Sequence, residues 1–429
     1  MTVPSTRTRN PFVGPRAYKK GEGARFFGRG RELATLLNLL IARRLVLLYA
    51  PSGAGKTSLI QAALVPQLES EGFVVRHLVR VGAEVPPELA PLTPNRYLLA
   101  TLLALDDDRL PEERTRPEEL AQMGIASYLN RRHSDNKADE VLIFDQFEEL
   151  LTTDPADQTA KVSFLAQLGV ALEDPGRWAL FAIREDYLGS LRPLLVPLPT
   201  RLDTLFRLDL LDPAQARQVM QGPALVAGVT FSDDAAALLA NDLRRTIVQR
   251  LDGTSEVTLG QTIDPVQLQV VCYRLWERTF AANNRQRTIG IADIEQAGNV
   301  DEAIRFYYAE RVAAIEVEAG VREREIRDWI EERLITMGGL RGQVLREPEI
   351  TGGLSNAVIR ALENAHLVRA EERRGATWFE LSHDRLIAPI LADNARWRQQ
   401  NLIPLQHQAL RWNKHGRPDS MLLQVDALL

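Results

Sequence analysis

Residues 45 to 58 read LVLLYAPSGAGKTS, and this stretch decides the predicted fold. The run Leu45–Tyr49 is apolar and β-prone, which predicts a buried strand. The small-residue loop after it contains Gly53 and Gly55, which let a backbone curl round a polyphosphate without Cβ clashes. The loop runs into Lys56 at a helix start, where backbone N–H groups and the helix dipole attract an anion. The stretch therefore predicts a phosphate-binding loop between a strand and a helix.

Each position of this loop has a predicted role. The pattern requires a glycine, four free positions and then Gly-Lys-Ser/Thr, and Ala50 stands where the first glycine is usual. That position needs little freedom in φ, so alanine is a mild departure. Lys56 is expected to reach the β- and γ-phosphates of ATP or ADP, and the Thr57 hydroxyl to bind Mg²⁺. The predicted nucleotide-binding residues of the loop are Ala50, Pro51, Ser52, Gly53, Ala54, Gly55, Lys56, Thr57 and Ser58.

Residues 138–150, ADEVLIFDQFEEL, form the second informative stretch. Val141–Phe144 is fully apolar, as in a central parallel strand, and it ends on Asp145. A carboxylate at this edge faces the phosphate loop, so Asp145 is expected to hold Mg²⁺ through water. Either Glu148 or Glu149 is expected to orient or deprotonate the attacking water. For these two residues the sequence leaves the choice open, and a solvated acidic helix start is the alternative.

Further strands are predicted at Trp178–Ile183 and Phe206–Leu211. The first strand is followed by Arg184. Its planar guanidinium group has paired N–H donors that match phosphate oxygens, so Arg184 is predicted to sense the γ-phosphate. An exposed arginine paired with Glu185 or Asp186 is the alternative. Because strands and helices alternate, the fold class is α/β with a parallel sheet, and its ligand is expected at the carboxyl ends of the strands.

Composition excludes several classes of protein. The chain has 429 residues, 45% hydrophobic and 25% charged, as in a soluble protein of several domains. The net charge of -5 gives no general attraction to nucleic acid or anionic membrane. A single cysteine, Cys272, excludes an internal disulfide and fits a cytoplasmic protein. No membrane span or signal peptide is visible.

After residue 211 the pattern becomes mostly helical. Asp212-Pro213 and Asp264-Pro265 each predict a helix N-cap followed by a first-turn proline. Leu243–Gln261 is expected to include a polar loop. His366–Glu371 and Thr377–Leu381 predict two strands after a helix, which indicates a winged helix. The expected division is an irregular segment at 1–25, a P-loop NTPase core at 26–211, a helical lid at 212–299, a winged-helix domain with preceding helices at 300–400, and a helical segment or linker at 401–429.

Six motifs make the chain similar to the STAND class of P-loop NTPases, in the bacterial novel STAND group. They are NPFVGPRAY with FFGRGREL, APSGAGKTSL, VLIFDQFEELL, ALFAIREDYLGSL, DPVQLQVVCYRLWE and WFELSHDRLIAPI, and they cover nearly the whole chain. The resemblance implies a signalling switch built like AAA+ proteins. It is expected to be closed with ADP and to oligomerise through its NTPase domain on exchange to ATP, with slow Mg²⁺-dependent hydrolysis.

The same resemblance implies further site residues. Phe27, Gly28 and Arg29 would line the adenine side, and Arg184 matches the sensor arginine. Pro265 stands where the family's lid proline packs on adenine, although the usual preceding Gly-x is absent. His383 in Ser382-His383-Asp384 resembles a histidine that reaches the ADP β-phosphate from the winged helix. Sensor and effector domains or partner proteins are implied, and the apolar end LLQVDALL indicates a partner or a missing segment. By analogy alone, the role would be defence against phage or programmed cell death.

Two other functions are compatible with the sequence. An AAA-type remodelling or replication-initiator ATPase also pairs a P-loop core with a winged helix, and Arg201 is a possible arginine finger for a neighbouring subunit. A DNA-binding regulator would use the winged helix, with Arg373 and Arg374 at the wing tip. Glu371 and Glu372 adjoin these arginines, and salt-dependent binding to duplex DNA would favour this reading.

Overall fold

The computed structural model describes residues 10–402 and 406, apart from 84, 87–88, 90–92, 94, 134–138, 155, 250–254, 283–287, 297–299, 337–340, 374–375 and 383. The chain forms two compact units, residues 1–299 with 371–375, and the remainder from 300 onward. Each unit is described by itself.

The first unit begins with a five-stranded sheet in the order β2-β3-β4-β1-β5, and every neighbouring pair is parallel. The phosphate-loop strand β1 therefore lies at the sheet interior, between β4 and β5. Its strands are β1 (Leu45–Ala50), β2 (Val74–Val75), β3 (Glu140–Phe144), β4 (Arg177–Arg184) and β5 (Leu205–Arg207). This confirms the predicted α/β class with a parallel sheet.

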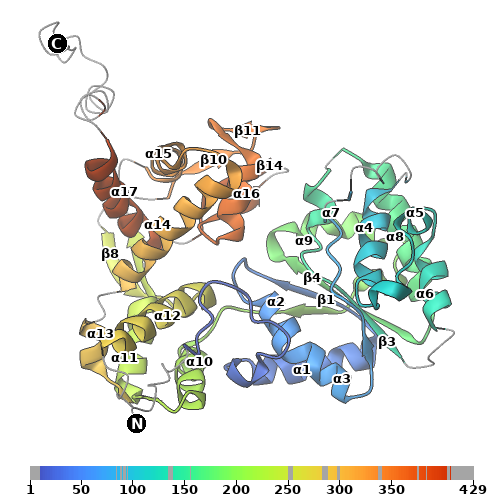
Figure 1. The fold of residues 1–429 in the computed structure, drawn as a ribbon, viewed down its shortest axis with the longest axis horizontal. Helices are drawn as coiled ribbons and strands as arrows, with labels where there is room; N and C mark the ends of the chain where they lie inside the picture. The colour runs from blue at the N-terminus through green and yellow to red at the C-terminus, as the bar shows by residue number, and fades with distance from the viewer. Residues whose placement is uncertain are drawn as a thin grey trace, which may run out of the picture. The chain divides into compact units, whose positions relative to one another are not determined.

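Side chains alternate across the sheet, so it has two apolar faces. Leu47, Phe144 and Phe181 belong to one buried cluster, and Val46, Ile143 and Leu180 belong to the other. In Figure 1, α1 and α3 lie on one side of the sheet and α4, α6 and α8 on the other. The helices of this region are α1 (Gly30–Arg43), α2 (Lys56–Leu59), α3 (Val65–Ser70), α4 (Arg96–Asp106), α5 (Pro117–Leu120), α6 (Ile125–His133), α7 (Glu149–Thr152), α8 (Gln158–Leu172) and α9 (Leu188–Leu191).

The helix after the phosphate loop runs from Lys56 to Ser70 in three consecutive segments. A π-helical turn, Ile60–Leu64, joins α2 to α3, and the helix passes through Pro66 to Ser70. Proline has no N–H, so it cannot bond the carbonyl four residues earlier, which is that of Ala62. The wider π turn accommodates this missing bond within a continuous helix.

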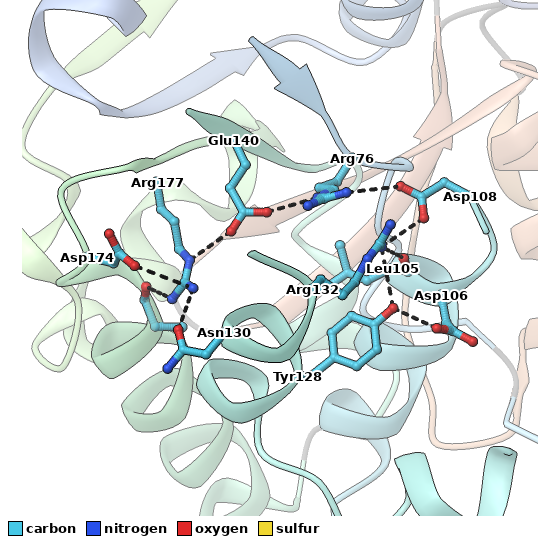
Figure 2. Close-up of polar contacts among 11 residues, drawn as sticks. Arg76, Leu105, Asp106, Asp108, Tyr128, Asn130, Arg132, Glu140, Asp174 and Arg177 are labelled. Atoms are coloured by element: carbon cyan, nitrogen blue, oxygen red, sulfur yellow. Dashed lines mark hydrogen bonds and ion pairs between the residues drawn. The ribbon is translucent and has the colours of Figure 1, made fainter. Parts of the chain in front are cut away.

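The amino-terminal edge of the sheet is closed by a buried cluster of ions, shown in Figure 2. Glu140 is fully buried at the start of β3, where it accepts a 2.8 Å hydrogen bond from Nε of Arg177 and another from Nε of Arg76. The cluster continues through the remaining charged and polar residues Asp108, Arg132, Tyr128, Asp106, Asn130 and Asp174. Because every buried charge has an opposite partner, the cluster fixes the register of β3 and β4 at the edge away from the phosphate loop.

Helices complete the first unit. They are α10 (Pro213–Val226), α11 (Asp233–Leu243), α12 (Pro265–Ala282) and α13 (Ile291–Gln296), accompanied by the two-stranded pairs β6 (Thr230–Phe231) with β9 (Thr288–Ile289), and β7 (Arg245–Gln249) with β8 (Ser255–Leu259). The polar loop expected within Leu243–Gln261 is thus largely a β-hairpin. The available signal was the β-branched residues on either side of residues 250–254, which themselves lie outside the described residues.

The second unit contains α14 (Val300–Ala319), α15 (Glu323–Leu334), α16 (Asn356–Asn364) and α17 (Ile387–Asn401). A three-stranded sheet of β10 (Gln343–Leu345), β14 (Ala376–Leu381) and β13 (Val368–Arg373) follows the order β10-β14-β13, and β11 (Ile350–Thr351) pairs with β12 (Leu354–Ser355). A helix followed by an antiparallel ribbon is the arrangement of a winged helix. Inside it, Arg327 is buried against Asp393 and Asn394, with distances of 2.8 and 2.9 Å. This joins α15 to α17.

Candidate functional site

The loop after β1 has the backbone that its glycines predict. Gly53 and Gly55 have φ of +79° and +94°, in the left-handed region that L side chains rarely adopt. Gly55 is the residue before α2, so the first N–H groups of that helix open toward the loop. Ala54 is buried beneath the loop, and its N–H bonds the Pro51 carbonyl at 3.3 Å. The loop therefore has the shape of an anion cradle at a helix N-terminus.

Lys56 lies at the mouth of this cradle. Its ammonium donates a 3.4 Å hydrogen bond to the carbonyl of Ala50, across the loop. Burial lowers the pKa of Lys56, and the carboxylates of Glu148 and Asp145 oppose that shift. A partly buried cation beside a ring of N–H groups is a strong attractor for a polyphosphate.

Thr57 and Asp145 meet although 88 residues separate them in the chain. The Thr57 hydroxyl donates a 2.7 Å hydrogen bond to Asp145 Oδ2, and only 2% of Asp145 is exposed. Asp145 follows the last residue of β3, so the parallel sheet brings it to the same edge as the loop. The two residues together supply the hard oxygen donors that Mg²⁺ prefers.

Glu148 and Glu149 point to different places. Glu148 accepts a 3.3 Å hydrogen bond from the backbone N–H of Arg184, and the charges of Lys56 and Arg184 act on it. Burial raises its pKa, and those two cations oppose the rise. Glu149 instead accepts from the N–H of Gly82 at 3.1 Å, on the segment after β2. Glu148 therefore faces the phosphate loop, and Glu149 stabilises a neighbouring turn.

Arg184 is the last residue of β4 and pairs in register with Ala50, the last residue of β1. Its guanidinium bonds Asp186 at 2.9 Å and lies over the ring of Tyr187 at 5.5 Å. The arginine thus stands beside the start of the loop, as predicted, and it also has the neighbouring carboxylate partner that the alternative reading named.

Phe27, Gly28 and Arg29 lie between the loop and α10. A Cβ on Gly28 would come within 2.9 Å of the Gln215 carbonyl, and one on Gly222 would strike the Phe27 ring at 2.4 Å. Both glycines are therefore required by close packing. Arg29 is 5% exposed, and its guanidinium donates to the carbonyls of Ala54 and Asp209 at 3.1 and 2.7 Å. Arg29 holds the loop backbone itself.

The N-terminus of α12 adjoins the phosphate loop. A Cβ on Gly53 would lie 3.5 Å from Asp264 Oδ2 and 3.6 Å from Val266 Cγ2. Asp264 caps the helix as predicted, because its Oδ1 accepts from the N–H groups of Val266 and Gln267. Burial raises its pKa to about 6, against the two backbone hydrogen bonds that lower it. Pro265, the next residue, begins the helix at this point.

Two residues near the loop were missed by sequence reasoning. Asp264 was recognised as a cap but not as a neighbour of Gly53, and Tyr18 was assigned only to an irregular segment. The backbone N–H of Tyr18 donates to Ser58 Oγ at 3.2 Å. The motif NPFVGPRAY was the available signal, since it contains three buried apolar positions, Phe12, Val13 and Tyr18.

Some predicted residues are not placed. His383 and Arg374 lie outside the described residues, as does the side chain of Arg373. Within the described part of the chain, no group of three or more His, Cys, Asp or Glu side chains could hold a metal ion. Among the described helices, none is long and apolar enough to cross a membrane.

Comparison with known proteins gives one family. The family model described as novel STAND NTPase 1 matches residues 11–420. No curated protein matches the chain. Among solved structures, the chain is similar to the Walker-type ATPase paby2304 of Pyrococcus abyssi, with 14% identity and a TM-score of 0.48, covering 89% of this chain and 100% of that one. It is also similar to the ORC2 protein of Aeropyrum pernix in its ADPNP-ADP complexes, with 15% identity and a TM-score of 0.42, covering 90% and 98%.

Proposed function

Because the chain belongs to the novel STAND NTPase 1 family, we propose that it is an ATP/ADP-dependent signalling switch with slow hydrolysis. The observation that carries this proposal is the convergence of Lys56, Thr57, Asp145, Glu148 and Arg184 at the carboxyl edge of one parallel sheet. A P-loop NTPase needs a phosphate cation, metal-ligand oxygens, a water-orienting acid and a γ-phosphate sensor, and these five residues are of those types.

Nucleotide would be held by the loop from Ala50 to Ser58, through its N–H groups and Lys56. Mg²⁺ fits the site because Thr57 Oγ1 and Asp145 Oδ2 are hard oxygens only 2.7 Å apart. These two residues would hold the ion, directly or through water. When bound, Mg²⁺ neutralises charge on the phosphates of the nucleotide.

Glu148 is our choice for the residue that orients the attacking water. Its carboxylate is under the charges of Lys56, Arg184 and Asp145, and burial raises its pKa, which makes the carboxylate a stronger base. Glu149 bonds Gly82 and supports the loop after β2 instead. Arg184 is proposed to sense the γ-phosphate, exchanging its ion pair with Asp186 for phosphate oxygens.

Adenine is proposed to lie between the Phe27–Gly28 turn and the start of α12 at Pro265. Support comes from Arg29, next to this turn, which donates a hydrogen bond to the Ala54 carbonyl of the phosphate loop, and from the contact of the α12 start with Gly53. His383 is proposed, from the Ser-His-Asp pattern alone, to contact the β-phosphate of ADP.

The proposed switch is closed with ADP and assembles through the NTPase core after exchange to ATP. To move a closed-to-open ratio from 99:1 to 1:99, ligands must favour the open state by about 5.5 kcal/mol. One charge-assisted hydrogen bond to the γ-phosphate supplies about 1.5–3 kcal/mol. A second input is therefore required, either a trigger on a sensor partner or the assembly itself. A role in defence is proposed by analogy with the family alone.

The direct test is to denature freshly purified protein and identify the released nucleotide. About one equivalent of ADP per chain is the expected result. Empty protein that turns over added ATP rapidly would replace the switch with a motor. Empty protein that binds neither nucleotide would refute the function.

One observation supports a motor as the second candidate. Thr200, Arg201 and Leu202 are consecutive residues with φ of 53°, 52° and 49°, and non-glycine residues in this region cost about 1–2 kcal/mol each. The strained turn presents Arg201 at the surface just before β5. A finger acting on a neighbouring subunit predicts ATP turnover per subunit that rises with protein concentration and is lost in Arg201→Ala.

A further inference from the structure

Residues Asn10–Arg25, here called the strap, bind two parts of the first unit at once. They contact helix α12 of the lid, and they also contact the helix that starts at the phosphate loop. In the sequence this segment reads as irregular, with prolines and glycines, and only Gly23–Arg25 forms a 3-10 turn. Its buried residues nevertheless make it part of the fold.

The amino end of the strap contacts α12 over a little more than one turn, from Tyr273 to Glu277. Asn10 Nδ2 donates to the Tyr273 carbonyl and to Glu277 Oε1, both at 3.1 Å. The rings of Phe12 and Trp276 meet edge to face with centroids 6.0 Å apart. These contacts lie 263 to 267 residues apart in sequence, so they join the amino end of the strap to the lid.

The contacts with the phosphate-loop helix are equally close. The backbone N–H of Tyr18 donates to Ser58 Oγ at 3.2 Å, and Val13 and Tyr18 form one apolar cluster with Ala62. Gly23 passes so near the helix that a Cβ there would lie 2.6 Å from the Ala62 carbonyl. That carbonyl is the one that Pro66 leaves without an intrahelical N–H four residues later.

Tyr18 joins the two sides directly. While its N–H bonds Ser58, its phenol oxygen accepts a 3.2 Å hydrogen bond from Gln269 Nε2 on α12. Only 5% of Tyr18 is exposed, and its ring packs edge to face on Phe26. Tyr18 therefore links Ser58, at the phosphate loop, to Gln269 on the lid helix α12. Ser58 is the residue immediately after Thr57, the proposed Mg²⁺ ligand.

Hydrogen bonds within the strap make it rigid, so a displacement of one helix that it contacts is transmitted to the other. Glu22 receives two 2.7 Å hydrogen bonds from Arg16, one of 2.7 Å from Arg25 and one of 2.8 Å from the N–H of Lys19. These bonds close the segment between Arg16 and Arg25 into a compact loop. If α12 and the phosphate-loop helix separate, a rigid strap cannot keep its contacts with both of them.

We propose that the strap couples the phosphate-loop helix to lid helix α12, and that Tyr18 is the positioning residue of this coupling. The inference deepens the proposed switch and rests on it for its nucleotide consequences. If α12 moves away from Ser58, either the hydrogen bond between Tyr18 and Gln269 or the one between Tyr18 and Ser58 must break. Loosening the strap should therefore loosen the lid and the phosphate loop together.

Tyr18→Phe tests the coupling because it removes only the phenol oxygen. The matched control is Tyr128→Phe, which removes another buried phenol that donates to Asp106 at 2.7 Å, in the cluster of Figure 2. Hydrogen exchange without nucleotide should become faster in Tyr18→Phe at both residues 265–276 and residues 56–64. The control should leave both segments unchanged. Faster exchange in the lid segment alone, or in neither, would overturn the coupling.

Release of labelled ADP is the second readout. Tyr18→Phe should release ADP about three to ten times faster, as expected for one lost hydrogen bond, and Tyr128→Phe should not. Unchanged release from Tyr18→Phe would contradict a link to the nucleotide. If the parent protein binds no nucleotide, the proposed function fails, but hydrogen exchange still decides the coupling.

A disulfide gives a further test, in which one protein is compared with itself before and after reduction. A Cβ on Gly14 would lie 3.9 Å from Cβ of Tyr273, within the range for a disulfide. Gly14→Cys with Tyr273→Cys, in a Cys272→Ala background, can be compared with itself before and after reduction. Oxidised protein should release ADP at least about threefold more slowly than reduced protein. Equal rates in the two redox states would refute the strap as a coupler.

Discussion

The hydroxyl of Thr57 and the carboxylate of Asp145 are hydrogen-bonded at 2.7 Å, although one belongs to the helix after β1 and the other to the end of β3. Strand β4 lies between those two strands, so the contact spans the sheet edge over Arg184. The pair fixes the proposed metal position before any ion binds.

Lys56→Ala is expected to weaken ATP and ADP binding by about 100-fold or more, because a buried charge-assisted contact to phosphate is lost. Lys20→Ala is the control, since Lys20 forms an exposed ion pair with Glu69. Titration of a fluorescent ADP analogue measures both variants. Unchanged affinity in Lys56→Ala would remove the phosphate-loop assignment.

The two glutamates after β3 should separate in a hydrolysis assay. Glu148→Gln is expected to lower the single-turnover rate by about 10²- to 10⁴-fold with nucleotide affinity retained. Glu149→Gln should leave the chemical step nearly unchanged and lower thermal stability, because it weakens the contact with Gly82. The reverse pattern would exchange the two roles.

Asp145→Asn is expected to remove the effect of Mg²⁺ on nucleotide binding. An amide is a weaker ligand for a hard cation than a carboxylate, whereas Lys56 and the loop remain intact. Affinity for ADP measured with Mg²⁺ and with a chelator should differ in the parent protein and agree in the variant. A variant that still responds fully to Mg²⁺ would place the metal ligand elsewhere.

Asp264 should make stability depend on pH. Its folded-state pKa of about 6 lies above the ordinary value of 3.8, so its contribution to folding is complete below about pH 4 and is lost as pH rises through 6. Asn caps a helix as well as Asp does but carries no charge. Asp264→Asn should therefore raise the free energy of unfolding by on the order of 1 kcal/mol at pH 8, with no gain at pH 4. Urea unfolding at the two pH values measures this difference, and an equal effect at both would show that the carboxyl does not titrate between them.

Glu140→Gln is expected to lower the free energy of unfolding by about 3 kcal/mol, because the buried Arg177 and the partly buried Arg76 lose the negative charge that they share (Figure 2). Glu119→Gln, which breaks an exposed pair with Arg131, should cost less than about 1 kcal/mol. Nucleotide affinity should change in neither variant, since the cluster closes the opposite edge of the sheet. Urea unfolding and ADP titration measure the two quantities.

Much of the first unit could be predicted because its signals are local. Leu45–Ala50, the glycines and Lys56-Thr57 form one continuous pattern, and the apolar run before Asp145 is another. Parallel strands bring such strand ends to one edge, so the meeting of Thr57 with Asp145 follows from the pattern. The register of Ala50 with Arg184 follows in the same way once β4 is adjacent to β1.

Other features depend on contacts that no short pattern contains. The different contacts of Glu148 and Glu149 follow the turn after β3, which carries Gln146 at a φ of 53° and leaves Glu149 bonded to the N–H of Gly82. The strap was predicted as irregular because its partners on α12 lie some 260 residues away. Strands β7 and β8 were missed because their β-branched residues were grouped with the polar residues between them into one expected loop.

The bond between Asn10 and Tyr273 also bears on how the protein is made. A ribosome adding about 5 to 20 residues per second completes α12 roughly 13 to 50 seconds after the strap. During that interval Phe12 has no Trp276 to cover it, while the sheet from β1 to β5 can already fold. The last step of folding in the first unit should therefore be the capture of its own amino end, and a chaperone that shields apolar nascent segments would have its target there.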